Sequence, residues 1–178
     1  MLTGNYRQRI KAIHERLGIP DDYESRYGLP LQNEAEKLVC AGHDMFSRSQ
    51  QMTPTACMAW VAMRDTALDD DVSLLLVSAF RGVDYQAAII DRQLEQNLAI
   101  DSILTSVAAP GYSEHHTGCA IDLTTVGCPP LKECFEETRA FNWLSENAIR
   151  FGFTLSYPRD SENKIVYEPW HWMAREDL

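Results

Sequence analysis

The sequence contains no run of about 20 consecutive apolar residues, the length that an α-helix needs to cross a bilayer. Residues 1–17 mix charged and apolar side chains, so they offer neither the apolar stretch nor the small-residue cleavage site of a secretory signal. These absences predict a chain without a membrane span. They also predict a cytoplasmic location, unless another export route carries the protein to the cell envelope.

Basic residues are scarce, because 16 Lys and Arg face 26 Asp and Glu and give a net charge of −10. An extended basic surface for nucleic acid or anionic lipid is therefore not expected. Cysteines number five, an odd count that cannot pair completely within one chain. Cys128 and Cys134 flank two prolines and could bridge, although free thiols are the default in a reducing compartment.

The chain is long enough for one globular domain with a substantial core, since 45% of its 178 residues are apolar. It shows no internal repeat, low-complexity stretch or linker. We therefore expect a single domain over residues 1–178. Residues 1–52 would form a helical N-terminal part and residues 53–178 the catalytic core.

Hydrophobic periodicity predicts four main helices. In residues 32–51 the apolar side chains share one helical stripe, with Asn33 as N-cap and Glu36 three residues later. Residues 55–68 follow Thr53-Pro54, a typical helix start. The other two helices are expected over residues 84–97, capped by Asp84, and over residues 132–151, ending at Gly152.

Short apolar runs predict the strands. Residues 73–80 suit a buried strand, and residues 153–157 and 165–167 suit two more, joined by the polar loop 158–164. From residue 119 to 123 the side chains alternate, so Ala120 and Asp122 share one face of a strand. Helices followed by a small antiparallel sheet indicate an α+β fold.

Two segments carry the candidate chemistry: Ser113-Glu114-His115-His116-Thr117-Gly118-Cys119-Ala120-Ile121-Asp122 and Glu168-Pro169-Trp170-His171-Trp172. Together they offer two histidines and one aspartate for a metal, with a glutamate three residues before the last histidine. A zinc site with three protein ligands keeps its fourth position open for water, and a nearby carboxylate can move the protons of that water. The combination points to a hydrolase.

These segments resemble the zinc D,D-peptidases of peptidoglycan metabolism, the family of the D-alanyl-D-alanine carboxypeptidases associated with vancomycin resistance. The family pattern Ser-x-His-x-x-Gly-x-Ala-x-Asp is matched from Ser113 to Asp122, and Glu-x-x-His at Glu168 and His171. Residues 78–81, Ser-Ala-Phe-Arg, resemble the family's Ser-Gly-Tyr-Arg segment. The resemblance runs from about Thr53 to Trp172 and implies a Hedgehog/D,D-peptidase-like fold.

The resemblance implies that His115, Asp122 and His171 bind the metal. His116 is a rival to its neighbour, but it occupies a variable position of the pattern and is expected in a supporting role, at the rim or on the surface. Two imidazoles and one carboxylate suit zinc, although iron, cobalt or manganese accept similar ligands. Zinc is expected, because peptide hydrolysis needs a Lewis acid and no redox step.

Further roles follow from the same resemblance. Glu168 is expected to be the general base and acid, and Arg81 to stabilise the oxyanion, whereas sequence alone would favour a salt bridge for Arg81. Ser113 is expected to grip the substrate. The weaker candidates for that pocket are Gln86 and Tyr157. Arg159 offers a charge for a carboxylate, but it is expected on a solvated loop.

The resulting hypothesis is a zinc-dependent carboxypeptidase that removes the terminal D-alanine from peptidoglycan stem peptides, with D,D- or L,D-specificity. Alternatives are an intracellular D-Ala-D-Ala dipeptidase and a phage-type endopeptidase of peptidoglycan. From another class comes a non-catalytic zinc-binding module, as in the similar Hedgehog signalling domain. Because this chain keeps both Glu168 and Arg81, the enzyme is the favoured interpretation.

Overall fold

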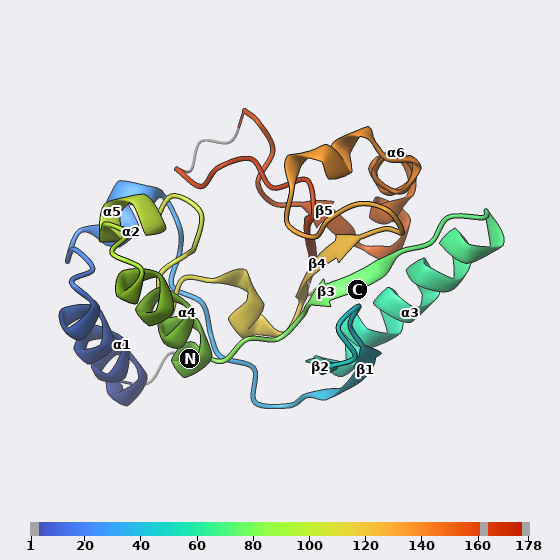
Figure 1. Ribbon diagram of the computed structural model, residues 1–178. Helices are drawn as coiled ribbons and strands as arrows, with labels where there is room; N and C mark the ends of the chain where they lie inside the picture. Colours follow the sequence, from blue (N-terminus) through green and yellow to red (C-terminus); the bar gives the residue numbers. More distant parts are fainter. Residues whose placement is uncertain (1–3, 161–163, 176–178) are drawn as a thin grey trace.

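The computed structural model describes residues 4–160 and 164–175 (Figure 1). The α-helices are α1 (Gly4–Leu17), α2 (Tyr23–Tyr27), α3 (Pro54–Asp69), α4 (Val83–Glu95), α5 (Ile100–Ile103) and α6 (Arg139–Asn147). The 3-10 helices are η1 (Glu114–Thr117), η2 (Glu133–Glu137) and η3 (Ala148–Phe151). The strands are β1 (Val39–His43), β2 (Ser49–Met52), β3 (Leu75–Ser78), β4 (Ala120–Thr124), β5 (Phe153–Leu155) and β6 (His171–Ala174).

The strands form two antiparallel sheets. β1 and β2 make a hairpin, and the other strands form a sheet in the order β3-β4-β6-β5. Strand β4 lies inside this sheet and is buried along its whole length. Its register places Asp122 opposite Ser78 on one side and opposite His171 on the other. Mixed helices and small antiparallel sheets confirm the α+β prediction.

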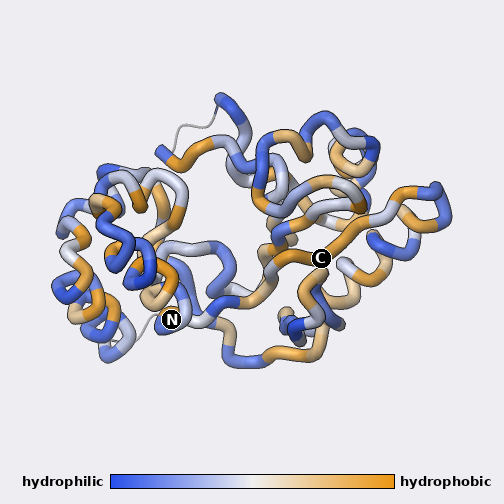
Figure 2. Tube along the Cα trace, viewed as in Figure 1, coloured by the Kyte–Doolittle hydropathy of each residue, from blue (hydrophilic) through white to orange (hydrophobic). Residues whose placement is uncertain are grey.

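Two hydrophobic clusters stabilise the fold. The sheet cluster lies among the four-stranded sheet, α3 and α6, and includes Trp60, Ile121 and Trp143. The helical cluster lies among α1, α2, α4 and α5, and includes Tyr23 and Ile90. Figure 1 shows these helices on one side of the molecule, with η1 between them and the sheet. Figure 2 shows hydrophobic residues along the sheet and on part of the surface of each flanking helix.

Several predicted elements are confirmed. Thr53 caps α3 by accepting a hydrogen bond from the backbone N–H of Ala56, and Gly152 ends η3 in a left-handed conformation with φ 78°. Helix α4 agrees with the prediction within two residues, but its N-cap is Gly82 instead of Asp84. The N–H of Val83 is bound by Glu34 Oε1 at 2.8 Å, so a distant carboxylate does what Asp84 was expected to do.

The helix predicted over residues 32–51 is wrong, so the helices of the N-terminal part are α1 and α2 among its described residues. The segment contains an extended stretch followed by β1 and β2. Its hairpin turn is built on the buried Asp44, whose Oδ1 accepts from the backbone N–H groups of Phe46 at 2.8 Å and Arg48 at 2.9 Å. Phe46 from the predicted apolar stripe is 53% exposed. Local hydrogen bonds from the backbone to the Asp44 side chain thus favour a turn over the helix that the periodicity predicted.

Two C-terminal predictions also need correction. The helix expected over residues 132–151 is broken into η2, α6 and η3, because Thr138 accepts from the N–H of Phe141 and starts α6 as a new helix. The strand expected at 165–167 is absent there, and β5 pairs with β6 instead. Within the predicted loop 158–164, residues 161–163 lie outside the described residues.

No helix among residues 4–160 and 164–175 is long and apolar enough to cross a membrane. Cys128 and Cys134 have free thiols whose sulfur atoms lie 3.8 Å apart.

Candidate metal centre and catalytic cleft

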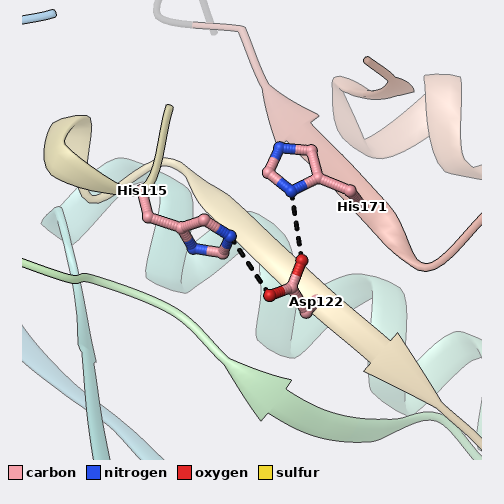
Figure 3. A group of neighbouring side chains, drawn as sticks. All are labelled: His115, Asp122 and His171. Carbon is pink, nitrogen blue, oxygen red and sulfur yellow. Dashed lines mark hydrogen bonds and ion pairs between the residues drawn. The ribbon is translucent and has the colours of Figure 1, made fainter. Parts of the chain in front are cut away.

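Three buried side chains converge beside the middle of β4. Asp122 on β4 lies directly opposite His171 on β6, so the strand register alone brings them together. His115 comes from η1, which leads into β4 through Gly118. Figure 3 shows both rings pointing toward the Asp122 carboxylate. One potential ligand atom from each residue lies within 4.8 Å of the other two.

Gly118 makes this approach possible. It has φ 69°, a left-handed conformation that glycine adopts without the strain of a side chain. An added Cβ would also lie 3.0 Å from Leu38 and 3.2 Å from the backbone nitrogen of Thr53. The chain therefore bends at Gly118, and the bend turns His115 back over β4.

His115 directs one ring nitrogen toward the shared point. Its Nδ1–H donates to the carbonyl of Ala79 at 2.6 Å, which leaves Nε2 as the lone-pair nitrogen. Nε2 lies 3.2 Å from Asp122 Oδ2, yet it has no hydrogen-bond partner of adequate geometry among the described residues. Burial, together with the charge of Arg81, lowers the pKa of His115 to about 4. A neutral imidazole with an unused lone pair is suited to metal binding.

His171 uses its other nitrogen. Nδ1 lies 3.1 Å from Asp122 Oδ1, while Nε2 lies 2.9 Å from Glu114 Oε2. Burial acts to lower the pKa of His171, but its hydrogen bonds to Asp122 and Glu114 outweigh burial and raise the pKa to about 10. Despite burial, the two histidines hold the pKa of Asp122 well below its usual range. The negative charges of Asp122 and Glu114 therefore stabilise a positive charge between His171 Nδ1 and Asp122.

The donor set fits zinc on these observations. It combines two imidazole nitrogens and one carboxylate oxygen, all buried and close together, and His115 Nε2 has no hydrogen-bond partner in the part of the chain that the structure describes.

His116 points elsewhere, although it is as buried as its neighbour. Its Nδ1–H donates to the carbonyl of Arg81 at 2.6 Å, and its Nε2 accepts from the N–H of Gly111 at 3.0 Å. Burial lowers its pKa to about 4, against the opposing effect of the bond to Arg81. His116 is thus neither a metal ligand here nor a rim or surface residue. It links the Arg81 turn to the loop before η1.

Glu168 approaches the same point from the turn before β6. One carboxylate oxygen lies 3.8 Å from His171 Nδ1, and the side chain is 11% exposed. The backbone N–H of His171 donates to the Glu168 carbonyl at 3.0 Å, so Glu-x-x-His forms a tight turn here. Burial raises the pKa of Glu168 to about 7. A carboxyl group of this kind can both accept and release a proton near neutral pH.

Arg81 lies between β3 and α4. The backbone of Arg81 is hydrogen-bonded to the two adjacent histidines of the motif. The Arg81 N–H donates to the His115 carbonyl at 3.2 Å, and the Arg81 carbonyl accepts from the His116 ring. Its Nε is buried without a hydrogen-bond partner among the described residues. The salt bridge that sequence alone favoured is not among the ion pairs of the described residues. A buried, unpaired N–H group is available to an acceptor on a bound molecule.

The three candidate metal ligands, Glu168 and Arg81 face one cleft of about 640 Å³. Ser113, Gln86 and Tyr157, the three predicted substrate-binding residues, line it as well. Gln86 donates from Nε2 to the Ala108 carbonyl at 2.8 Å, whereas its Oε1 has no partner among the described residues. Trp170 also lines the cleft, while Trp172 packs in the sheet cluster.

Arg159 does not line the cleft. Its guanidinium pairs with Glu133 and Glu136 and lies 4.1 Å from the centre of the Tyr167 ring. This position agrees with the expectation that Arg159 lies on a solvated loop. It does not agree with a role for Arg159 in binding a substrate carboxylate.

Sequence reasoning missed Glu114 and Ser156. Glu114 lies inside the motif, but at a position that the family pattern leaves open, and Ser156 follows β5 with no motif around it. The available clue was that a metal-binding histidine usually donates its second ring N–H to a carboxylate, a backbone carbonyl or water, and Glu114 is a carboxylate within the motif.

Comparison with known proteins supplies the family context. Residues 49–174 match the family model of the VanY D-alanyl-D-alanine carboxypeptidases. Over 184 aligned residues the chain is 32% identical to the putative carboxypeptidase YodJ of Bacillus subtilis, covering 96% of this chain and 67% of that protein. It is 31% identical to a D-alanyl-D-alanine carboxypeptidase of Enterococcus faecalis, but covers only 42% of that protein.

Solved structures give the same picture. The LD-carboxypeptidase LdcB superposes with a TM-score of 0.71 and 31% identity, covering 82% of this chain and 71% of that one. The vancomycin resistance D,D-pentapeptidase VanY, solved in complex with Zn(II), superposes with a TM-score of 0.60 and 25% identity, covering 84% and 80%.

Proposed function

The chain belongs to the VanY family of D-alanyl-D-alanine carboxypeptidases, and we propose that it is a zinc-dependent carboxypeptidase acting on peptidoglycan stem peptides. The observation that carries the proposal is the meeting of His115, Asp122 and His171 with Glu168 in one cleft. The bond to be broken is the peptide bond to the terminal D-alanine. The carbonyl carbon of the preceding residue gains the oxygen of a water molecule, and D-alanine leaves with its free amine.

His115 Nε2, a carboxylate oxygen of Asp122 and His171 Nδ1 would hold the zinc ion. When bound, zinc would act as a Lewis acid that polarises a carbonyl and lowers the pKa of water, so that a nucleophile is available at neutral pH. The protein contributes the fixed positions of the three donors. Since these donors are buried, they are already desolvated before the metal arrives.

Glu168 is assigned the proton transfers. Its carboxylate lies beside the metal point and opens onto the cleft, so it can take a proton from the attacking water and return one to the leaving amine. Tyr157, whose pKa is raised well above its usual value by burial and by the charges of Glu114 and Glu168, stays a neutral hydroxyl on the same wall.

Arg81 is assigned to the negative charge that develops on the carbonyl oxygen. Two hydrogen bonds, one from the backbone N–H of Arg81 and one to its carbonyl, fix the point from which its side chain enters the cleft. Its Nε has no competing hydrogen-bond partner among the described residues. Ser113, Gln86 and Tyr157 then remain to hold the terminal carboxylate and the backbone of the substrate.

The test is mass spectrometry of products after the zinc-loaded protein meets D-Ala-D-Ala, a stem tetrapeptide and a stem pentapeptide, with Glu168→Ala as control. Loss of one D-alanine from a stem peptide, absent in the variant, is the expected result. Cleavage of the pentapeptide alone gives D,D-specificity, and cleavage of the tetrapeptide gives L,D-specificity. Cleavage of the dipeptide alone would replace the proposal by a dipeptidase, and no cleavage of any would favour the endopeptidase or the zinc-binding module.

A further inference from the structure

A carboxylate lies behind the metal site, on the far side of the His171 ring. Glu114 Oε2 accepts from His171 Nε2–H at 2.9 Å and from Ser156 Oγ–H at 2.6 Å. The Glu114 side chain is 22% exposed. Glu114 lies at the start of η1, Ser156 follows β5 and His171 begins β6, so the contact joins three separate segments.

Strand pairing places the backbone of His171 but does not choose which ring nitrogen faces Asp122. Rotation of the ring about its bond to Cβ would exchange the positions of the nitrogen and carbon atoms along its edge. A hydrogen bond to Nε2 removes that freedom, because Glu114 holds Nε2–H on one side while Nδ1 faces Asp122 on the other. The ring is thereby set in a single orientation and a single tautomer for metal binding.

His115 provides the contrast within the same site. Its remote nitrogen is Nδ1, and the partner is a backbone carbonyl, Ala79 O, at 2.6 Å. The two histidines therefore present opposite nitrogens, and only His171 is backed by a charged group. A carboxylate partner also makes the imidazole a stronger electron donor than a carbonyl partner does.

We propose that Glu114, held in place by Ser156, is a positioning residue that orients His171 and strengthens its Nδ1 as a metal ligand. The inference rests on the proposed function, since it concerns the same metal site. Glu114 is separated from the metal point by the width of the His171 ring, so it acts through His171 and not as a ligand itself. Ser156 adds the second hydrogen bond that keeps the carboxylate from turning toward solvent.

Zinc affinity is the first readout, measured by competition with a fluorescent chelator for the wild type, Glu114→Ala, Glu114→Gln and Ser156→Ala. Glu146→Gln, on the exposed face of α6, is the matched control. Loss of the carboxylate should weaken zinc binding about 10- to 100-fold in Glu114→Ala. Glu114→Gln should lie between that variant and the wild type, because its amide oxygen still accepts from Nε2–H but carries no charge. Ser156→Ala should show a smaller loss, and Glu146→Gln none.

A second readout is NMR of the imidazole nitrogens in the zinc-loaded wild type, which should show the proton of His171 on Nε2 and zinc on Nδ1. Zinc on Nε2 would overturn the proposal. Unchanged zinc affinity in both Glu114 variants would do the same, even if turnover were lost, because Glu114 would then act on the substrate. If Glu114→Ala does not fold, Glu114→Gln and Ser156→Ala still decide the matter.

Neither readout depends on turnover, so the two proposals can fail separately. A wild type that binds zinc tightly but cleaves no peptide would refute the carboxypeptidase activity and leave the role of Glu114 to be decided by zinc affinity.

Discussion

The two sides of the cleft hold their residues in different ways. On the sheet side, Asp122 and His171 are fixed by the register of two neighbouring strands, and all of β4 is buried. On the helical side, Gln86 and Arg92 reach the cleft from α4, which is positioned by side-chain packing in the helical cluster. The two sides therefore depend on different interactions, and we expect metal binding and substrate binding to respond separately to substitution.

Removal of a metal ligand should have the largest effect. His171→Ala deletes one of the three donors, and we expect it to lose stoichiometric zinc and measurable turnover. Metal analysis of protein purified without chelator measures this directly. His43→Ala, which removes an exposed histidine, is the control. Equal metal content in the two variants would refute the proposed site.

Two arginines of the cleft give the next largest contrast. Arg81→Gln should lower kcat about 10²- to 10³-fold with zinc still bound, because it removes a donor to the developing negative charge. Arg92→Gln on α4 should mainly raise KM, by less than about tenfold, since an exposed charge contributes little. Steady-state kinetics on the preferred peptide separate the two parameters. A similar fall in kcat for both would mean that the two sides of the cleft are not chemically distinct.

Two fully buried isoleucines, one in each cluster, test the comparison through stability. Ile121→Ala and Ile90→Ala each remove a side chain that is 0% exposed, and each should lower the free energy of unfolding by about 2–5 kcal/mol. Only Ile121→Ala should also weaken zinc binding, because it adjoins Asp122 on β4. Urea unfolding and chelator competition measure the two effects. Equal loss of zinc affinity in both would show that the clusters behave as one unit.

His116 sits where the two sides meet, and its substitution should have a moderate effect. His116→Gln keeps a donor and an acceptor, whereas His116→Phe leaves the Arg81 carbonyl and the Gly111 N–H without their partner. We expect His116→Phe to cost about 1–3 kcal/mol of stability and to lower kcat, and His116→Gln to retain most of both. Identical behaviour of the two variants would mean that only the volume of the side chain matters.

The smallest effect should come from His14, which joins α1 to the loop before the motif through a 2.8 Å hydrogen bond to the Pro110 carbonyl. Burial lowers the pKa of His14, so the folded state holds it neutral. Its contribution to stability is complete above its unfolded pKa of about 6.5 and is lost as pH falls from there through the lowered folded pKa.

Urea midpoints at about pH 7.5 and about pH 5.5, measured with chelator present, should therefore differ more in the wild type than in His14→Gln. The variant removes this titration and leaves the other histidines unchanged. An equal pH dependence in both proteins would show that His14 does not contribute.

Local chemistry allowed much of the fold to be read from the sequence. The Thr53 cap of α3, the alternation along β4 and the Gly152 stop each depend on residues close in sequence, and each agrees with the structure. The failed helix over residues 32–51 had a similar local pattern. The segment is not helical because Asp44 stabilises a turn within it and because its backbone bonds to distant residues. For example, the Ala35 N–H donates to the His116 carbonyl at 2.8 Å.

The sequence by itself determined which residue types could make a metal site: two histidines and an aspartate, a nearby glutamate, and an arginine after a buried strand. Only the tertiary structure decided how they are used. It set which nitrogen of each histidine faces the metal point, placed Glu114 and Ser156 behind His171, and turned His116 toward Arg81. The physical reason is that these choices depend on hydrogen bonds between segments up to 57 residues apart, which no local pattern of side chains encodes.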